Sequence, residues 1–231
     1  MNASGRWFCV LLVVVACFGA CSAPAGDPVE TSTAPALAVA TPAPTEPEKV
    51  LPELSPEEAR KAIDTGIKLF HQGATKTALR NLEEGLHNLP DDPQGLAYQA
   101  RALDKLGRSD EASAVYEKIL AKDAKNAEIH WRYGNTLLVA GRDQPAEQHF
   151  TTAIELGYGA TALLSRSAVS MKRKEYEKAI KDLDAAIAAE PELAQAYILR
   201  AQAYQKLGKK DKATQDFFKA RKLNGRRSPM R

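Results

Sequence analysis

The sequence predicts an all-α fold, an α-solenoid of five helix-turn-helix repeats stacked one on the next. Each repeat reads as two amphipathic helices, most clearly at residues 194–224. Glycine stands at the turn between the two helices in four of the five repeats. Small residues recur every 33 or 34 positions, a period that is typical of stacked repeats rather than of a closed globule. These small residues are Ala78, Ala112, Ala146, Ala179 and Ala213.

Residues 1–20 have the composition of an export signal peptide. Arg6 precedes an apolar run, Trp7 to Phe18, that is short for a membrane span, and two small residues follow it. The segment resembles a bacterial lipobox, in which small residues precede a cysteine that is lipidated and becomes the new N-terminus. The resemblance implies a lipoprotein with diacylglycerol and an acyl chain such as palmitate on Cys21. Ser22 after that cysteine implies delivery to the periplasmic face of the outer membrane.

Two alternatives remain open for this end of the chain. Phe18 departs from the aliphatic residue that is usual in a lipobox, and Cys17 after Val14-Val15-Ala16 is a second lipidation candidate with a shorter apolar run. Cleavage at Ala23-Pro24-Ala25 would instead give a soluble secreted or periplasmic protein, although the proline argues against that site. All three cysteines lie within the first 21 residues, so the repeats can hold neither a disulfide nor a thiolate metal site.

Residues 21–54 predict a disordered tether between the lipid and the repeats. The segment is rich in proline, alanine and threonine, has no aromatic residue, and carries five acids against one lysine. Proline favours extended backbone, so such a tether is semi-stiff and can hold a folded domain away from a membrane. Ordered structure is predicted to begin with Ser55 as a helix N-cap, followed by Pro56 and two glutamates that suit the positive end of the helix dipole.

The repeat array is predicted to span residues 55–224, with a basic tail at 225–231. Gly225 and Pro229 are expected to end the last helix, which leaves apolar surface around Phe218 uncovered at the end of the array. The five units are expected at residues 59–92, 93–126, 127–159, 160–193 and 194–227.

The residues inside each unit carry a family resemblance. The pattern of large and small residues is clearest in the last unit, at Tyr197, Ala201, Tyr204, Ala213, Phe217 and Ala220. With this pattern the chain resembles a tetratricopeptide repeat protein. It departs from the pattern at Arg200, and at Lys174 the fourth unit lacks the turn glycine, so a less comfortable turn is expected there. The resemblance implies a right-handed superhelix whose first helices line a concave groove.

The resemblance also implies which side chains face that groove. Tyr98, Arg101, Trp131 and Arg132 cluster in adjacent units, and these residue types most often dominate binding energy. We therefore expect this patch to grip an extended or helical peptide segment of a partner protein. The alternative for Trp131 is packing between units. The full set of candidates is Ile63, Ile67, Phe70, Tyr98, Arg101, Trp131, Arg132, Asn135, Leu138 and Met171.

Other function classes are disfavoured. The four histidines lie in different units without metal-site spacing, and no nucleotide-binding or nucleophile motif is found, so we expect no enzyme, no metal and no cofactor. The positive charge sits in the tail rather than along the repeats, which argues against nucleic acid. A groove for the C-terminal carboxylates of chaperones is disfavoured because Ile63 and Ile67 are apolar.

The sequence thus predicts a non-enzymatic scaffold, lipid-anchored in the bacterial envelope, that binds partner proteins. Resemblance to repeat-bearing outer-membrane lipoproteins makes an assembly role natural, as a pilot for a pilus secretin or in outer-membrane protein assembly. The alternatives are a soluble exported binding module and a regulatory subunit of an envelope enzyme. The pattern leaves the oligomeric state open.

Overall fold

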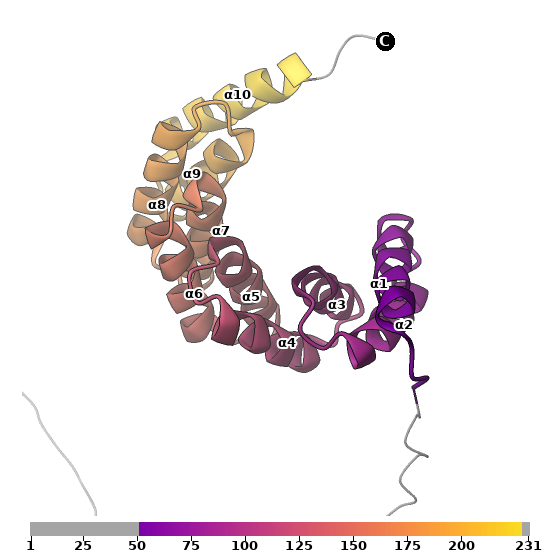
Figure 1. The fold of residues 1–231 in the computed structure, drawn as a ribbon. Coiled ribbons are helices and arrows are strands. Elements are labelled where there is room, and N and C mark those ends of the chain that lie inside the picture. The colour runs from indigo at the N-terminus through magenta and orange to yellow at the C-terminus, as the bar shows by residue number, and fades with distance from the viewer. Residues whose placement is uncertain (1–50, 228–231) are drawn as a thin grey trace, which may run out of the picture. The chain divides into compact units, whose positions relative to one another are not determined.

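The computed structural model describes residues 51–227, and these residues form ten helices and no strand. The predicted signal peptide, the lipidation candidates Cys21 and Cys17, most of the tether and the last four residues lie outside the described part. The predicted all-α solenoid of five helical pairs is confirmed (Figure 1). The pairs are α1 (Pro56–His71) with α2 (Thr75–Asn88), α3 (Pro93–Lys105) with α4 (Ser109–Lys122), α5 (Ala127–Val139) with α6 (Asp143–Glu155), α7 (Gly159–Lys172) with α8 (Tyr176–Ala189), and α9 (Ala194–Lys206) with α10 (Lys210–Arg227).

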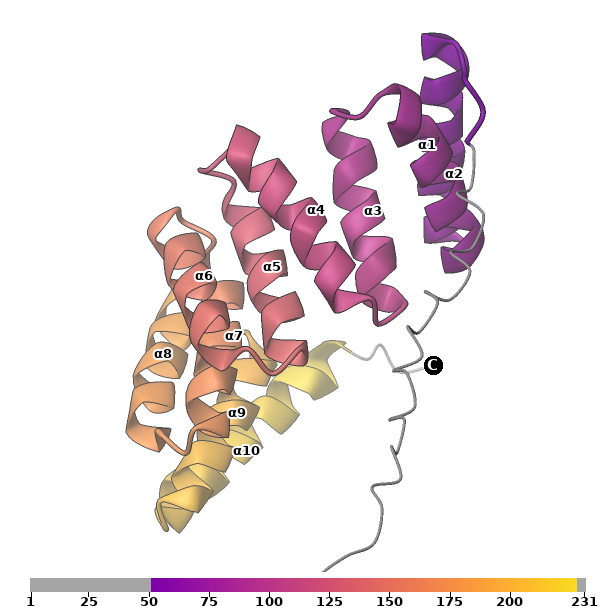
Figure 2. The same cartoon turned by 90° about the horizontal axis from the view of Figure 1, so that it is seen from below.

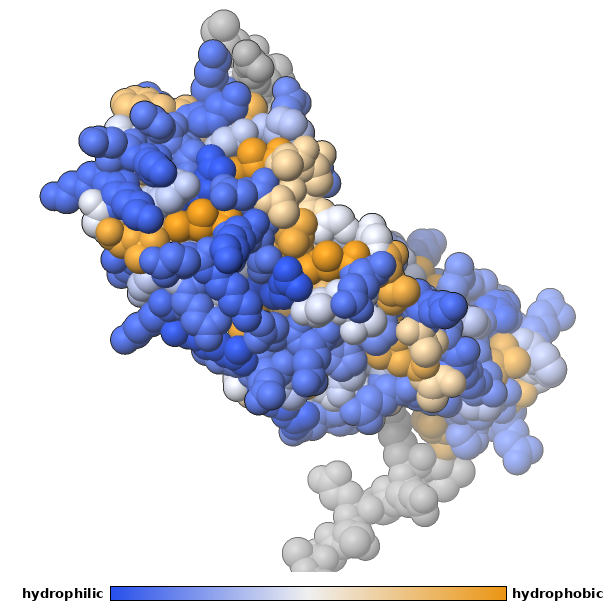
Figure 3. Space-filling model, turned by 90° about the vertical axis from the view of Figure 1, so that its left-hand side faces the viewer, coloured by the Kyte–Doolittle hydropathy of each residue, from blue (hydrophilic) through white to orange (hydrophobic). Residues whose placement is uncertain are grey.

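Each helix packs mainly against the helix before it and the helix after it in the chain. Figures 1 and 2 show the helices following one another along a curve, with α3, α5, α7 and α9 on its inner side and α4, α6 and α8 on its outer side. The outer side, seen in Figure 3, is mostly hydrophilic, with apolar side chains in narrow bands. Such an array is stabilised by contacts between neighbouring repeats, because one helical pair buries too little apolar surface alone.

The start of the array follows from its first residues. The Ser55 hydroxyl accepts a hydrogen bond from the Glu58 backbone N–H at 3.3 Å, and the Glu58 carboxylate accepts one from the Ser55 N–H at 2.9 Å. This reciprocal capping box satisfies two N–H groups that the first helical turn leaves without partners. The expected N-cap at Ser55 and the proline in the first turn are both confirmed.

The turns inside the repeats also follow the sequence. The glycines at the turns have positive φ, for example 84° at Gly73 and 72° at Gly208. In the fourth repeat Lys174 takes that place with φ 63°, and it is the one non-glycine residue with positive φ in the described part of the chain. A side chain disfavours this backbone conformation, so the expected discomfort of the fourth turn is confirmed.

The core lies between the helices of each pair and between neighbouring pairs. The five periodic alanines are almost completely buried, which lets the helices approach closely. Gly134 shows how close this approach is, because a Cβ atom there would lie 2.6 Å from the Phe150 ring. Phe150 itself is fully buried.

The end of the last helix differs from the sequence-based expectation. Gly225 does not end the last helix, since α10 continues through it to Arg227. Glycine costs helix stability but does not forbid the conformation, and a helix that is packed along its earlier turns can extend past it.

Among the described helices, none is both long and apolar enough to cross a membrane.

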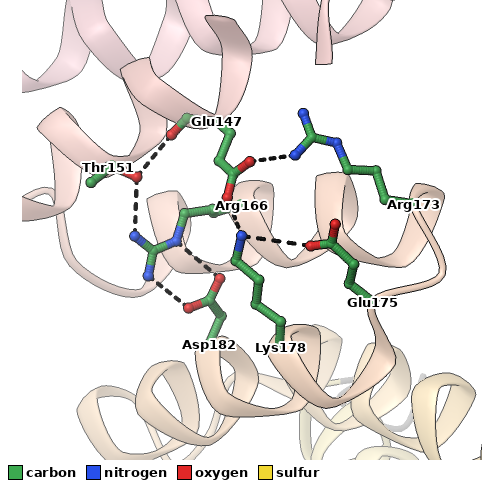
Figure 4. Close-up of polar contacts among 7 residues, drawn as sticks. All are labelled: Glu147, Thr151, Arg166, Arg173, Glu175, Lys178 and Asp182. Carbon is green, nitrogen blue, oxygen red and sulfur yellow. Dashed lines mark hydrogen bonds and ion pairs between the residues drawn. The ribbon is translucent and has the colours of Figure 1, made fainter. Parts of the chain in front are cut away.

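Ion pairs join the third and fourth repeats (Figure 4). Glu147 of α6 pairs with Arg173, just after α7, at 2.5 Å and also with Lys178 of α8. Arg166 of α7 binds the Asp182 carboxylate of α8 through two hydrogen bonds, and both side chains are mostly buried. The network fixes how α8 sits against α6 and α7 with side chains that the repeat pattern does not specify.

Candidate functional site

The candidate site is a pocket of about 330 Å³ between α3 and α5 on the inner side of the array. It is lined by Tyr98 and Arg101 of α3, by Glu128 and Arg132 of α5, and by the apolar side chain of Ile129. The two helices place these residues together because each presents the same face to the groove, one repeat apart. The structure thus brings Tyr98, Arg101 and Arg132 into one pocket.

Arg101 packs beside two aromatic rings that contact each other, since the Phe70 and Tyr98 ring centres are 5.5 Å apart. Its guanidinium carbon lies 4.5 Å from the Tyr98 ring centre and 4.9 Å from the Phe70 ring centre, distances at which a cation is attracted to the ring. The Tyr98 hydroxyl is in turn fixed by His71 Nε2 at 2.9 Å. Lys105, one helical turn further along α3, covers the Phe70 ring at 4.2 Å.

The charge of Arg101 is not neutralised within the site. No carboxylate of residues 51–227 forms an ion pair with Arg101 or Lys105, whereas Arg132 donates to Glu128 at 2.8 and 2.6 Å. The rings orient the Arg101 guanidinium without satisfying its N–H donors, which remain able to bind an acceptor. The pocket therefore combines an oriented cation with an apolar and aromatic wall.

Trp131 links the third repeat to the fourth. Its ring stacks on Tyr158 with the ring centres 5.2 Å apart, and its indole N–H donates to the Ser165 hydroxyl at 2.9 Å. The Arg132 guanidinium carbon lies 5.4 Å from the indole centre, and the Asn135 side chain donates to the Trp131 carbonyl at 2.9 Å. The indole is half-buried, so Trp131 packs between units, as the alternative held, and still borders the inner face.

Several expected groove residues have other positions. Ile63 and Phe70 are buried core residues, 0% and 4% exposed, which corrects their assignment to the groove. Ile63 is buried because Gly85 of α2 lies directly against it and lets the two helices approach closely. Ile67 and Leu138 are partly buried and pack on the same core. Met171 lies on α7 in the fourth repeat and is not among the residues that line this pocket.

Three residues of the site were not predicted from the sequence. His71 and Lys105 hold the aromatic and basic cluster around Arg101, and Tyr158 provides the surface on which Trp131 stacks. Lys105 could have been found, because it follows Arg101 by four residues and so shares its helix face. Tyr158 could not have been found, because it lies in the connection after the third repeat, where one residue of the usual 34 is absent and the pattern assigns no position.

A pair of histidines lies in the same repeat as Trp131. His130 Nδ1 and His149 Nδ1 are 2.9 Å apart, and His130 Nε2 lies 3.1 Å from the Ala124 carbonyl oxygen. The His149 ring also packs on Tyr133 at 4.4 Å, and burial together with the nearby His130 lowers the pKa of His149. The described residues contain no group of three or more possible metal ligands, and these contacts give the two histidines structural partners.

Comparison with known proteins agrees with this geometry. Three models of the tetratricopeptide repeat match residues 69–130, 169–208 and 194–225, together just over half of the 231 residues. A sequence search of curated proteins found no match.

Solved structures of the same fold were also found. A crystal structure of MamA superimposes with a TM-score of 0.67 at 22% identity, covering 77% of this chain and 100% of MamA. PilF of Pseudomonas aeruginosa gives 0.64 at 20% identity, covering 76% of this chain and 78% of PilF. A thermophilic repeat protein of Thermus thermophilus gives 0.57 at 22% identity, covering 71% of this chain and 91% of that one. At these identities the similarity establishes the fold.

The repeat period, the ten paired helices and the matching models agree with one another. Members of the family they identify are protein-interaction scaffolds and are typically non-catalytic. The chain belongs to the tetratricopeptide repeat family.

Proposed function

We propose that the protein is a non-enzymatic scaffold that binds a peptide segment of a partner protein on the inner side of its second and third repeats. The observation that carries the proposal is the Arg101 guanidinium, which packs on the Tyr98 and Phe70 rings and has no carboxylate partner in the described part of the chain. It borders a pocket that also contains Tyr98 and Arg132. Arginine and aromatic side chains at the centre of a concave surface commonly dominate protein binding.

The contacts define what the bound segment must offer. An acidic side chain or a backbone carbonyl could accept hydrogen bonds from Arg101, and a carboxylate would gain more because both partners are charged. The apolar wall formed by Ala97 and Ile129 suits a small or medium apolar side chain next to that acceptor. A segment with an acidic and an apolar residue close together fits this pocket.

The proposed setting is the bacterial envelope. Lipid on Cys21 and the tether at residues 21–54 would hold the array near the outer membrane, where it would help to assemble an envelope complex. The resemblance of the sequence to repeat-bearing outer-membrane lipoproteins motivates a role of the pilus or secretin pilot type. The lipobox departure at Phe18 favours a second candidate, a soluble exported binding module. Mass spectrometry of the mature N-terminus separates the two, because only the first requires lipid on the cysteine.

Site-specific photo-crosslinking in the source organism tests the proposed groove. Gln94 is exposed and lines the pocket, so a photoreactive residue there should crosslink the partner. Glu177 is exposed on α8, outside the pocket, and is the matched control position. A protein crosslinked from position 94 and not from position 177 supports the proposal. Equal crosslinking from both positions, or from position 177 alone, contradicts it.

A further inference from the structure

The last helix, α10, exposes an apolar side chain whose equivalent is buried in each of the four earlier repeats. The second helix of every repeat has a large side chain at one equivalent place, and in the first four repeats this side chain is fully buried. In the fifth repeat Phe217 at this place is 37% exposed, and its neighbour Phe218 is 65% exposed. The four buried equivalents are Leu82, Tyr116, Leu183 and Phe150.

In the earlier repeats, a helix packs over the surface that α10 leaves exposed. In each earlier repeat the second helix is packed against the first helix of the next one, as α4 is against α5. Tyr116 of α4, for example, stacks on Tyr133 of α5 with the ring centres 5.8 Å apart. No helix among residues 51–227 packs beyond α10. The surface at Phe217 therefore fits a helix, because the same place is filled by a helix four times in this chain.

The charge around Phe217 and Phe218 indicates which kind of helix can bind there. Asp216, the buried acid of α10, is already bound by Arg200 through two hydrogen bonds of 2.8 Å. Of the other charged side chains described on α10, one is acidic, Asp211, and the rest are basic and exposed. Two copies of this surface would repel each other on contact, whereas an acidic partner would be attracted. The basic side chains are Lys210, Lys212, Lys219, Arg221 and Lys222.

We propose that α10 is a second docking surface, distinct from the groove, that binds an amphipathic helix of a partner protein. The apolar stripe of that helix covers Phe217 and Phe218, and acidic residues beside the stripe face Arg221 and Lys222. The bound helix takes the place of the first helix of a sixth repeat. The scaffold can then hold two partners, one in the groove and one at the end of the array.

Titration of the full chain with two synthetic helical peptides tests this surface. Both peptides carry the same apolar stripe, and the remaining positions are glutamate in one and lysine in the other. The glutamate peptide should bind, and the lysine peptide should bind about tenfold or more weakly, because the two differ in charge alone. No binding of the glutamate peptide, or equal binding of both, overturns the proposal.

Variants locate the binding surface. Phe218→Ser removes a side chain that is 65% exposed, so the fold should be kept while the glutamate peptide binds about tenfold or more weakly. The charge reversal of Arg221→Glu with Lys222→Glu should invert the preference between the two peptides. Val139→Ser is the matched control, because Val139 is a large apolar residue, 81% exposed, at the end of α5. Unchanged binding by Phe218→Ser, or equal loss in Val139→Ser, contradicts the assignment.

Two other occupants would give different results. If a second copy covers α10, the wild-type chain will dimerise in analytical ultracentrifugation and Phe218→Ser will be a monomer. If an anionic membrane covers it, phosphatidylglycerol vesicles will bind the wild type and will prevent binding of the glutamate peptide. Either result overturns the helix proposal.

Discussion

The Arg166 guanidinium donates two hydrogen bonds to the Asp182 carboxylate, at 3.0 and 2.7 Å. One repeat later Arg200 binds Asp216 in the same way, with two bonds of 2.8 Å. Both pairs connect the first and second helices of a repeat, at places where the third repeat has Tyr133 packed on His149. The fourth and fifth repeats thus use a mostly buried ion pair where the third uses two rings.

Loss of one partner from this ion pair should destabilise the array. Asp182→Ala leaves the mostly buried Arg166 with the Thr151 hydroxyl but without its carboxylate partner, so we expect the free energy of unfolding to fall by about 2–4 kcal/mol. Urea denaturation followed by circular dichroism measures the change. Glu111→Ala is the control, because Glu111 forms an exposed pair with Arg108 and should cost at most about 1 kcal/mol. Equal effects of the two substitutions would contradict the structural role of Asp182.

Trp131 should contribute to stability through its contacts with the next repeat. Trp131→Phe keeps an aromatic ring over Tyr158 but loses the hydrogen bond to Ser165, which should cost about 1 kcal/mol. Trp131→Ala also loses the ring packing and should cost about 2–4 kcal/mol. Thermal unfolding of both variants measures the difference. An unchanged melting temperature in Trp131→Ala would mean that the indole serves binding alone.

Two helical glycines should respond differently to replacement by alanine. At Gly134 the new Cβ would clash with the buried Phe150 ring, so Gly134→Ala should destabilise the array by about 1–3 kcal/mol. At Gly225 the new Cβ would meet no described atom within 4 Å outside its chain neighbours and the nearby backbone of α10, so Gly225→Ala should leave stability unchanged or raise it by up to about 1 kcal/mol. Chemical denaturation of the two variants tests the close approach of α5 and α6. A harmless Gly134→Ala would disprove it.

Stability should fall between neutral and mildly acidic pH because of His149. Burial, with the nearby His130, lowers the pKa of His149 below 6.5 in the folded chain. As the pH falls, the unfolded chain therefore takes up the proton first, and the stability that is present above pH 6.5 is lost as the pH passes through the lowered pKa.

Denaturation midpoints at neutral and mildly acidic pH measure this effect. His149→Asn removes the titrating ring, so its midpoint should depend less on pH than that of the wild type. Gln148 is exposed on α6 and does not titrate, so Gln148→Asn should leave the wild-type pH dependence unchanged. If His149→Asn and the wild type lose the same stability over this range, the titration of His149 is not responsible.

The fold could be predicted from the sequence because one period controls it. The recurring alanines and turn glycines dictate helix length, turn position and close packing, and Lys174 stood out as the exception that the backbone confirms. The Arg200 departure was also visible, but its partner Asp216 lies on the next helix and was recognised only through the contact.

The candidate site was less predictable, because burial depends on how closely two particular helices approach. Ile63 was assigned to the groove from its place in the repeat, yet Gly85 draws α2 onto α1 and buries it. Phe70 is covered in a similar way by Arg101 and Lys105 of the next repeat. The spacing of Glu128 and Arg132 allows an ion pair along α5, whereas the lack of a carboxylate partner for Arg101 among residues 51–227 depends on how the helices pack.

The most direct test of the binding function is the dissociation constant for the partner that is crosslinked at position 94. Arg101→Met keeps an unbranched side chain over Phe70 and Tyr98 and removes the charge, so it should weaken binding about tenfold or more without lowering the melting temperature. Arg80→Ala removes an exposed charge on α2, outside the pocket, and should leave the constant unchanged. Wild-type affinity in Arg101→Met would contradict the proposal that the partner binds in this groove.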